Sequence, residues 1–268
     1  MKKILFLLAC LWTSCSLSVI PGPILVLSGA KLGTFAIAQQ DILKNIEPLV
    51  FEDEVKVRSR LQNLHDKGLL RFKPVNINLS YGPGFGTVAT IKPILHVKKG
   101  ADLDEFTALH EAKHINGMHS LTDALIFPAV ACIAFRKGWT PSIFRNILRI
   151  GGVGVLSKST RFFKGKHDEK VADTHAAENC SDSNAFKGAI REFRDDEDAM
   201  VRYLQYKCNA DKEVVKTALY LTDPHLPLTE NRADRLKRIY DRRVADGSLV
   251  EQSESWYKTL YNSLTSKK

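Results

Sequence analysis

The chain has 268 residues, enough to bury one substantial core, and 44% of them are hydrophobic and 26% charged, which suits a globular protein with membrane-contacting segments. The net charge of +9 fits an anionic membrane surface or nucleic acid, with a mildly basic solvated surface as the alternative. Because no nucleic-acid motif and no dense Lys/Arg run accompany this charge, we expect membrane proximity and no nucleic-acid partner.

The N-terminus has the features of a secretory signal. Two lysines precede an apolar run over Ile4–Leu11, as in the n-region and h-region of such a signal. A second apolar stretch begins at Ile24, and Ala36-Ile37-Ala38 forms an A-x-A site far from the first run. Residues 1–38 are therefore predicted to be a long cleaved signal or an uncleaved membrane anchor. We expect export, to the periplasm or an equivalent side, and a functional domain over 39–268.

A helix followed by a small sheet is expected next. Residues 41–66 read as helical, and Gly68 is a plausible stop. Between residues 73 and 97, apolar and polar residues alternate at the period of a strand. Residues 89–95 are a candidate edge strand, to which an extended peptide could add by backbone hydrogen bonds. The alternative is a strand that merely packs.

The next helix, over residues 102–117, contains the motif HExxH. His110 and His114 are four residues apart and share a helix face, so both imidazoles can point at one metal ion. Glu111 can then reach a water bound to that metal. Zinc lowers the pKa of such water from about 15.7 to roughly 7, which favours attack on an amide carbonyl. The alternative is an amphipathic helix with two solvent-facing histidines.

A zinc site needs a third protein ligand. The metzincin pattern HExxHxxGxxH is excluded, because Ser120 occupies its last position and His119 comes one residue early. The other candidate is a downstream helix on which Glu169 and Asp173 are four residues apart. Glu169 is predicted to bind the metal, and Asp173 to hydrogen-bond a ligand imidazole. A solvated acidic face is the alternative for this segment.

Two apolar runs separate these motifs. Residues 121–135 and 143–156 each span about 15 residues, whereas a bilayer-crossing helix needs roughly 20. Pro128 is expected to kink the first run, and glycines at 151, 152 and 154 loosen the second. We predict a helical hairpin over 121–156 that is interfacial, re-entrant or packed on the protein. Two internal core helices are the alternative.

The remainder after Glu178 is predicted to be helical, with Thr229 capping one helix and residues 256–264 forming the last. The predicted fold is therefore α+β and mostly helical, with a small sheet before the HExxH helix. The 5 cysteines argue against a disulfide framework, although Cys180 and Cys208 would either pair in an oxidising compartment or stay unpaired.

In its order of motifs, the chain resembles the HtpX-like and CAAX-prenyl-protease-like zinc peptidases, which are gluzincins. The shared features are a β-rich stretch, an HExxH motif with a further histidine at 119, an apolar segment, and Glu169-x-x-x-Asp173-x-x-Ala176. A weaker element runs from Pro224 to Leu236 and is similar to the family's HP…R box, but Leu226 separates its His from its Pro. The resemblance covers roughly residues 50 to 240.

The resemblance implies a zincin-type fold with one zinc ion per chain. It implies that His110, His114 and Glu169 are the zinc ligands, that Glu111 is the general base and that Asp173 supports a ligand. The resemblance also implies that His225 and Arg232 lie near the substrate or the developing oxyanion.

The predicted function is that of a membrane-associated zinc endopeptidase. Its substrates are expected to be extended segments of other proteins, with a role in protein quality control by family analogy. The first alternative is a catalytically silent, zinc-stabilised scaffold or binding protein at the membrane. The second is a basic membrane-surface protein in which HExxH is accidental.

Overall fold

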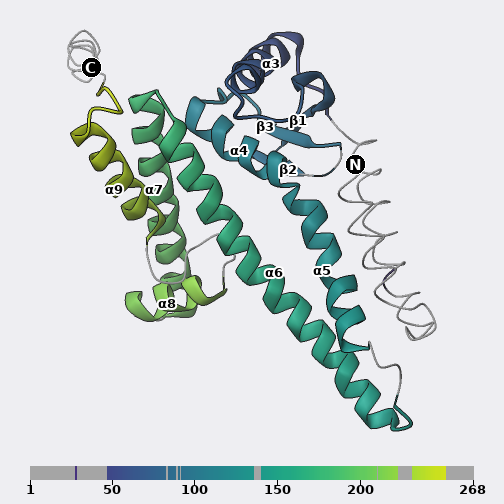
Figure 1. Cartoon of the computed structure of the whole chain (residues 1–268). Helices are drawn as coiled ribbons and strands as arrows, with labels where there is room; N and C mark the ends of the chain where they lie inside the picture. The colour runs from purple at the N-terminus through teal and green to yellow at the C-terminus, as the bar shows by residue number, and fades with distance from the viewer. Residues whose placement is uncertain are drawn as a thin grey trace.

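The computed structural model describes residues 28, 47–82, 84–88, 90, 92–135, 140–209, 211–222 and 231–251. Apart from Ser28, the predicted signal or anchor lies outside the described residues, as do His225, Thr229 and the expected last helix. The described chain is mostly helical with one small sheet, which confirms the expected α+β class (Figure 1).

The N-terminal part consists of one helix and a three-stranded sheet. Its elements in chain order are α3 (Phe51–Asp66), the short 3-10 helix η1 (Pro74–Asn76), β1 (Asn78–Gly82), β2 (Gly86–Val88) and β3 (Ile94–Lys98). The strand order is β1-β3-β2, with β1 parallel and β2 antiparallel to β3. Leu61, Leu64 and Leu95 are buried in the main core, so α3 and the sheet share one apolar interior.

The edge of this sheet differs from the prediction. Leu95 lies in β3, which is hydrogen-bonded on both sides and is the central strand of the described sheet. Ile94 and Leu95, the described end of the predicted edge strand, therefore lie in the central strand, because β2 runs antiparallel to β3 and pairs Val88 with Ile94. β2 is the edge strand that packs against the helix carrying HExxH.

That helix is α4 (Glu105–Gly117). It begins at Asp104, whose side chain accepts a hydrogen bond from the backbone of Thr107, as expected for a helix N-cap. It ends at Met118, which has a left-handed φ of 48° and turns the chain directly into α5 (His119–Ala134). The apolar side of α4 is buried in the core as predicted. The chemistry-bearing residues are thereby held on a rigid element.

The apolar runs form a projecting hairpin of α5 and α6 (Ile143–Asn179) (Figure 1). The second run continues without interruption into the segment of Glu169, because glycine weakens a helix by about 1 kcal/mol without ending it. The alternative of two core helices is wrong, because many of their large apolar side chains are exposed. These are Ile133, Ile143, Phe144, Ile147, Leu148, Ile150, Val155 and Leu156.

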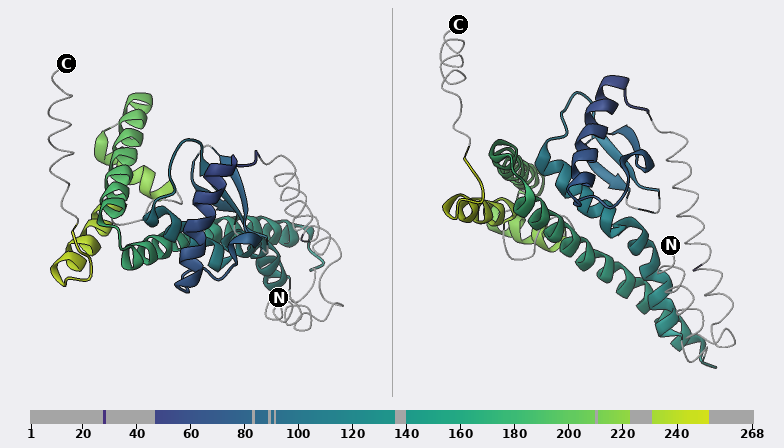
Figure 2. Two further views of the ribbon diagram at one scale, coloured as in Figure 1. Left: turned by 90° about the horizontal axis from the view of Figure 1, so that it is seen from above. Right: turned by 45° about the horizontal axis from the view of Figure 1, so that its top comes forward.

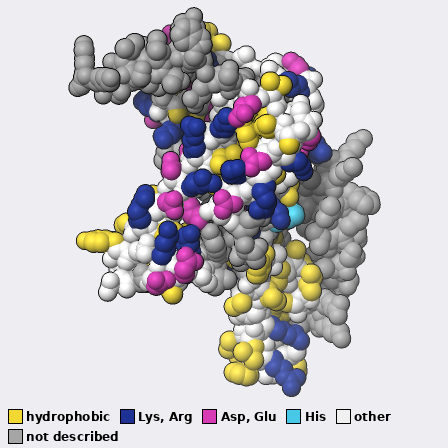
Figure 3. Space-filling model, turned by 90° about the vertical axis from the view of Figure 1, so that its left-hand side faces the viewer, with side chains coloured by type: hydrophobic (Ala, Val, Ile, Leu, Met, Phe, Trp, Pro, Cys, Tyr) yellow, Lys and Arg dark blue, Asp and Glu magenta, His cyan; other side chains and the backbone are white. Residues whose placement is uncertain are grey.

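Figure 3 shows these hydrophobic side chains gathered on the projecting arm, with basic side chains at its tip. The continuous stretch of α4 and α5, Glu105–Ala134, is long and apolar enough to cross a membrane, by length and composition alone. Only 6% of its most apolar window is buried inside the protein.

Three further helices follow: α7 (Ser183–Cys208), α8 (Lys212–Thr222) and α9 (Arg232–Ala245) (Figure 2). α9 packs against α6 and α7, and α8 packs against α7. α9 is capped by the side chain of Asn231 and not by Thr229, because the helix starts two residues later than predicted. Cys180 is buried, Cys208 is exposed and both are free thiols, so the considered disulfide is not formed.

Candidate metal centre

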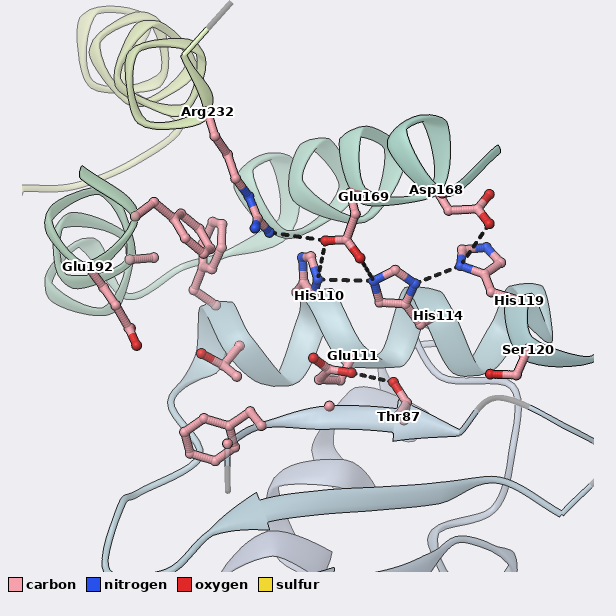
Figure 4. Close-up of a pocket in the computed structure, with 18 of the residues that line it drawn as sticks. Thr87, His110, Glu111, His114, His119, Ser120, Asp168, Glu169, Glu192 and Arg232 are labelled. Atoms are coloured by element: carbon pink, nitrogen blue, oxygen red, sulfur yellow. Dashed lines mark hydrogen bonds and ion pairs between the residues drawn. The ribbon is translucent and has the colours of Figure 1, made fainter. Parts of the chain in front are cut away.

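The two histidines of α4 and one glutamate of α6 point toward one another in a pocket (Figure 4). The Nε2 atoms of His110 and His114 are 3.0 Å apart. Each of them lies 3.5 Å from one oxygen of the Glu169 carboxylate. The predicted set of three ligands is therefore brought together, and it could hold a metal ion.

The geometry of the three side chains fits a divalent cation. Their donor atoms lie within 4.8 Å of one another, and the side chains are mostly shielded from solvent. Two imidazoles and one carboxylate form a donor set that leaves a fourth tetrahedral position open to water or substrate. The three side chains line a cavity of about 590 Å³, a volume typical of ligand-binding sites.

Asp173 lies beside the first candidate ligand, at an ion-pair distance. Its carboxylate is fully buried, and its Oδ1 lies 3.0 Å from Nδ1 of His110, the ring nitrogen on the side opposite Glu169. Arg232 donates to both carboxylate oxygens at 2.7 and 2.6 Å, and Arg235 donates to Oδ2 at 2.6 Å. Asp173 therefore orients His110 and is itself held by two guanidinium groups.

Arg235 was missed by the sequence reasoning, although its spacing of three residues from Arg232 on one helix was a usable signal. Arg232 lines the cavity, and its guanidinium lies 3.4 Å from an oxygen of Glu169 and 3.7 Å from the centre of the Phe193 ring. His225 lies outside the described residues, so its predicted position stays a prediction.

The charges around the two imidazoles separate their pKa values. Burial lowers the pKa of His110, but Asp173 and Glu169 raise it by more, to about 9. Burial and the nearby charge of His110 lower the pKa of His114 to about 4. The carboxylates beside His110 therefore favour its protonated form, and binding of a metal is expected to release a proton.

Glu111 lies on the same helix but faces the sheet. It is buried, and its Oε2 accepts a hydrogen bond from the hydroxyl of Thr87, at the centre of β2 (Figure 4). Burial raises the pKa of Glu111, while the charge of His110 and the bond from Thr87 lower it. Glu111 therefore lines the same cavity as the ligands, in an environment suited to exchanging protons. Sequence reasoning missed Thr87, since nothing local links it to α4.

A second group of ionisable residues borders the site. His119, the first residue of α5, lies beside His114, and its Nδ1 is 3.6 Å from an oxygen of Asp168. Lys164 pairs with Asp168 and, at 2.9 Å, with Asp123. Among the described residues, the group that could hold a metal ion consists of His110, His114 and Glu169, and His119 borders it.

Comparison with known proteins found no matching family model, no matching curated protein and no matching solved structure. The resemblance to the HtpX-like and CAAX-prenyl-protease-like peptidases, and the zincin-type fold that it implies, therefore remain predictions from the motifs.

Proposed function

We propose that this chain is a zinc-dependent endopeptidase that hydrolyses extended segments of other proteins at a membrane. The observation that carries the proposal is the convergence of His110, His114 and Glu169 on one point, with Glu111 lining the same cavity. This is the constellation required for metal-assisted hydrolysis, in which a cation, a water and a general base must meet at one carbonyl.

Zinc is the proposed metal because the two imidazoles and one carboxylate match the ligands that it takes at catalytic sites. When bound, zinc would polarise the scissile carbonyl and lower the pKa of a water molecule. The chain's own residues position these groups. Asp173 fixes the orientation of His110, and Arg232 holds Asp173 and approaches Glu169.

Glu111 is the proposed general base and acid. Its carboxylate takes the proton from the attacking water and later delivers it to the leaving amine, so that the amide C–N bond breaks and a new carboxyl group forms. Thr87 keeps one oxygen of Glu111 occupied, which leaves the other to reach the water. Stabilisation of the oxyanion by Arg232, or by His225, is part of the proposal.

An extended substrate is proposed because β2 offers a strand edge beside the cavity. β2 is one of the two edge strands of the described sheet, and Gly86 and Thr87 both line the cavity. A peptide that adds to this edge by backbone hydrogen bonds would lie across the ligands, largely independently of its side chains. This favours unfolded or extended protein segments as substrates, in keeping with a role in protein quality control.

The membrane location rests on the hairpin. Its exposed apolar side chains, among them Ile147 and Leu148 at 60% and 59% exposure, are unusually dense for a water-facing surface. A bilayer would cover them, which places the active site next to the membrane. Delivery to the exported side by residues 1–38 belongs to the same proposal.

The test combines metal analysis with proteolysis by the purified full chain. We expect about one zinc per chain and loss of this zinc in His114→Ala. Glu111→Gln should keep the zinc and lose about 10²–10⁴-fold in the hydrolysis of an unfolded protein. Glu213→Gln, an exposed change in α8, is the control and should be silent. Full biological effect of Glu111→Gln would instead support the zinc-stabilised scaffold, and absence of metal from folded protein would contradict both.

A further inference from the structure

The imidazole of His119 lies directly against a metal ligand. The Nδ1 atoms of His119 and His114 are 2.6 Å apart, a hydrogen-bond distance, and the two rings are nearly perpendicular at 83°. His114 directs its Nε2 toward Glu169 and His110, so this contact uses its other nitrogen (Figure 4). When Nε2 binds a cation, Nδ1 carries the proton and must donate it to an acceptor.

The two ligands are supported in the same way from opposite sides. Nδ1 of His110 has Asp173 at 3.0 Å, and Nδ1 of His114 has His119 at 2.6 Å. Histidine ligands in metal sites nearly always have such a partner, which fixes the tautomer and the ring orientation. His119 therefore occupies, for His114, the place that Asp173 occupies for His110.

Gly117 makes room for this arrangement. A β-carbon placed on Gly117 would overlap the ring of His119, whereas helical Gly154 and Gly188 have open space at the same point. The left-handed φ at the end of α4 belongs to Met118 and not to Gly117. The backbone conformation at position 117 therefore does not require glycine. The close approach of the His119 imidazole does require it, because a side chain would overlap the ring.

Charged residues of the hairpin lie beside His119. Asp168 lies 3.6 Å from Nδ1 of His119, and Lys164 joins Asp168 to Asp123. Asp123 belongs to α5, whereas Lys164 and Asp168 belong to α6. These ion pairs connect the two helices of the hairpin next to the candidate metal centre. Asp168 is the member of the group that lies nearest to His119.

We propose that His119 is a positioning residue for the metal centre, which accepts the Nδ1 proton of His114 and rests on Gly117. This inference depends on the proposed function only in that the site binds zinc. It adds a residue that holds a ligand without belonging to the ligand set.

The first test measures zinc affinity by chelator competition in the full chain. His119→Leu should weaken zinc binding by about 10–100-fold, the usual effect of removing such a partner. His119→Asn, whose amide oxygen can accept the same proton, should recover most of that loss. In the cobalt-loaded protein, the visible absorption bands should shift in His119→Leu and return in His119→Asn, a signature that a general loss of stability does not produce.

The second test is a double-mutant cycle. Gly117→Ala should weaken zinc binding in the unaltered chain, because its β-carbon displaces the His119 ring, but should have little further effect in a His119→Ala chain. Gly188→Ala, a helical change into open space, is the matched control and should leave zinc affinity unchanged. Additive effects of Gly117→Ala and His119→Ala would overturn the inference.

The results separate this inference from the proposed function. If His119→Leu and Gly117→Ala bind zinc as tightly as the unaltered chain does, the positioning role is overturned and the peptidase proposal still stands. Failure of the unaltered folded chain to bind zinc overturns the proposed function, and the positioning role with it.

Discussion

Glu111 and Asp173 are both buried carboxylates at the metal centre, yet their surroundings give them opposite properties. Burial raises the pKa of Asp173, but His110 and Arg232 lower it by more, so it stays ionised. Glu111 has no guanidinium in direct contact among its described partners, and burial keeps its pKa raised. One carboxylate thus suits a permanent charge that orients a ligand, and the other suits proton transfer.

This contrast predicts the pH dependence of hydrolysis. A general base must be ionised, so kcat/KM should fall as pH falls through the raised pKa of Glu111. Thr87 donates to the ionised form and thereby lowers this pKa, so Thr87→Val should raise it and move the acid limb to higher pH. Thr87→Ser keeps the donor and should restore the original profile. Identical pH–rate profiles for all three proteins would show that another group controls the acid limb.

At the scale of elements, α4 is fastened at both ends. At its C-terminal end, Met118 turns the chain into α5 and brings His119 back over Gly117. At its start, the carboxylate of Glu105 accepts hydrogen bonds from the backbone N–H groups of Ser181 and Asp182, at 2.9 and 2.7 Å. The helix with the two candidate ligand histidines is therefore attached to the connection between α6, which carries Glu169, and α7.

Removal of this attachment should destabilise the fold. Glu105→Gln replaces a charged acceptor with a neutral one and should lower the free energy of unfolding by about 2 kcal/mol, measured by denaturant titration. Burial raises the pKa of Glu105, but its bonds from Asp182 and Ser181 lower it overall. Its stabilisation is therefore present above the unfolded value of 4.5 and is lost as pH falls through the lower folded pKa.

The matched control is Glu178→Gln, which removes a solvent-exposed pair with Arg242 and should change stability by less than about 1 kcal/mol. Equal effects of the two changes would contradict a special role for Glu105 at the start of α4.

The described part of the molecule combines a compact body with an apolar arm. The main core joins residues of α3, the sheet, α4, α7 and α9, whereas the arm has its own small cluster of Ala131, Phe135 and Val153. The metal centre lies where the arm meets the body, because α4 continues into α5 and α6 runs through both (Figure 1). Contact of the arm with a bilayer would bring the cavity close to membrane-associated substrates.

Membrane contact is testable by vesicle flotation. The double change Ile147→Glu and Leu148→Glu should weaken binding to phospholipid vesicles at least about tenfold. The reason is that full burial of each apolar side chain contributes roughly 1.5–3 kcal/mol to the free energy of membrane binding. Val214→Glu, at a similarly exposed apolar position in α8, should have little effect. Zinc affinity should be unchanged in both proteins. Unchanged flotation of the double variant would remove the arm from the account of membrane association.

Sequence alone determined the parts of the site whose partners are close along one helix. His110, Glu111 and His114 share one turn, and Glu169 and Asp173 share another, so helical periodicity places them without knowledge of the fold. The same local rules predicted the α+β class and the hairpin of apolar helices. They also excluded His119 as the third ligand of the metzincin pattern, because it comes one residue too early.

Only the tertiary structure decided which distant groups meet. The bond from Thr87 to Glu111 depends on β2 taking the edge of the sheet, where the sequence pattern had placed residues 89–95. The approach of His119 to His114 depends on the turn at Met118, and the second guanidinium on Asp173 depends on how α9 crosses α6. Such contacts form when elements pack together, and packing is set by the sum of many weak interactions across the core rather than by the residues next to each partner.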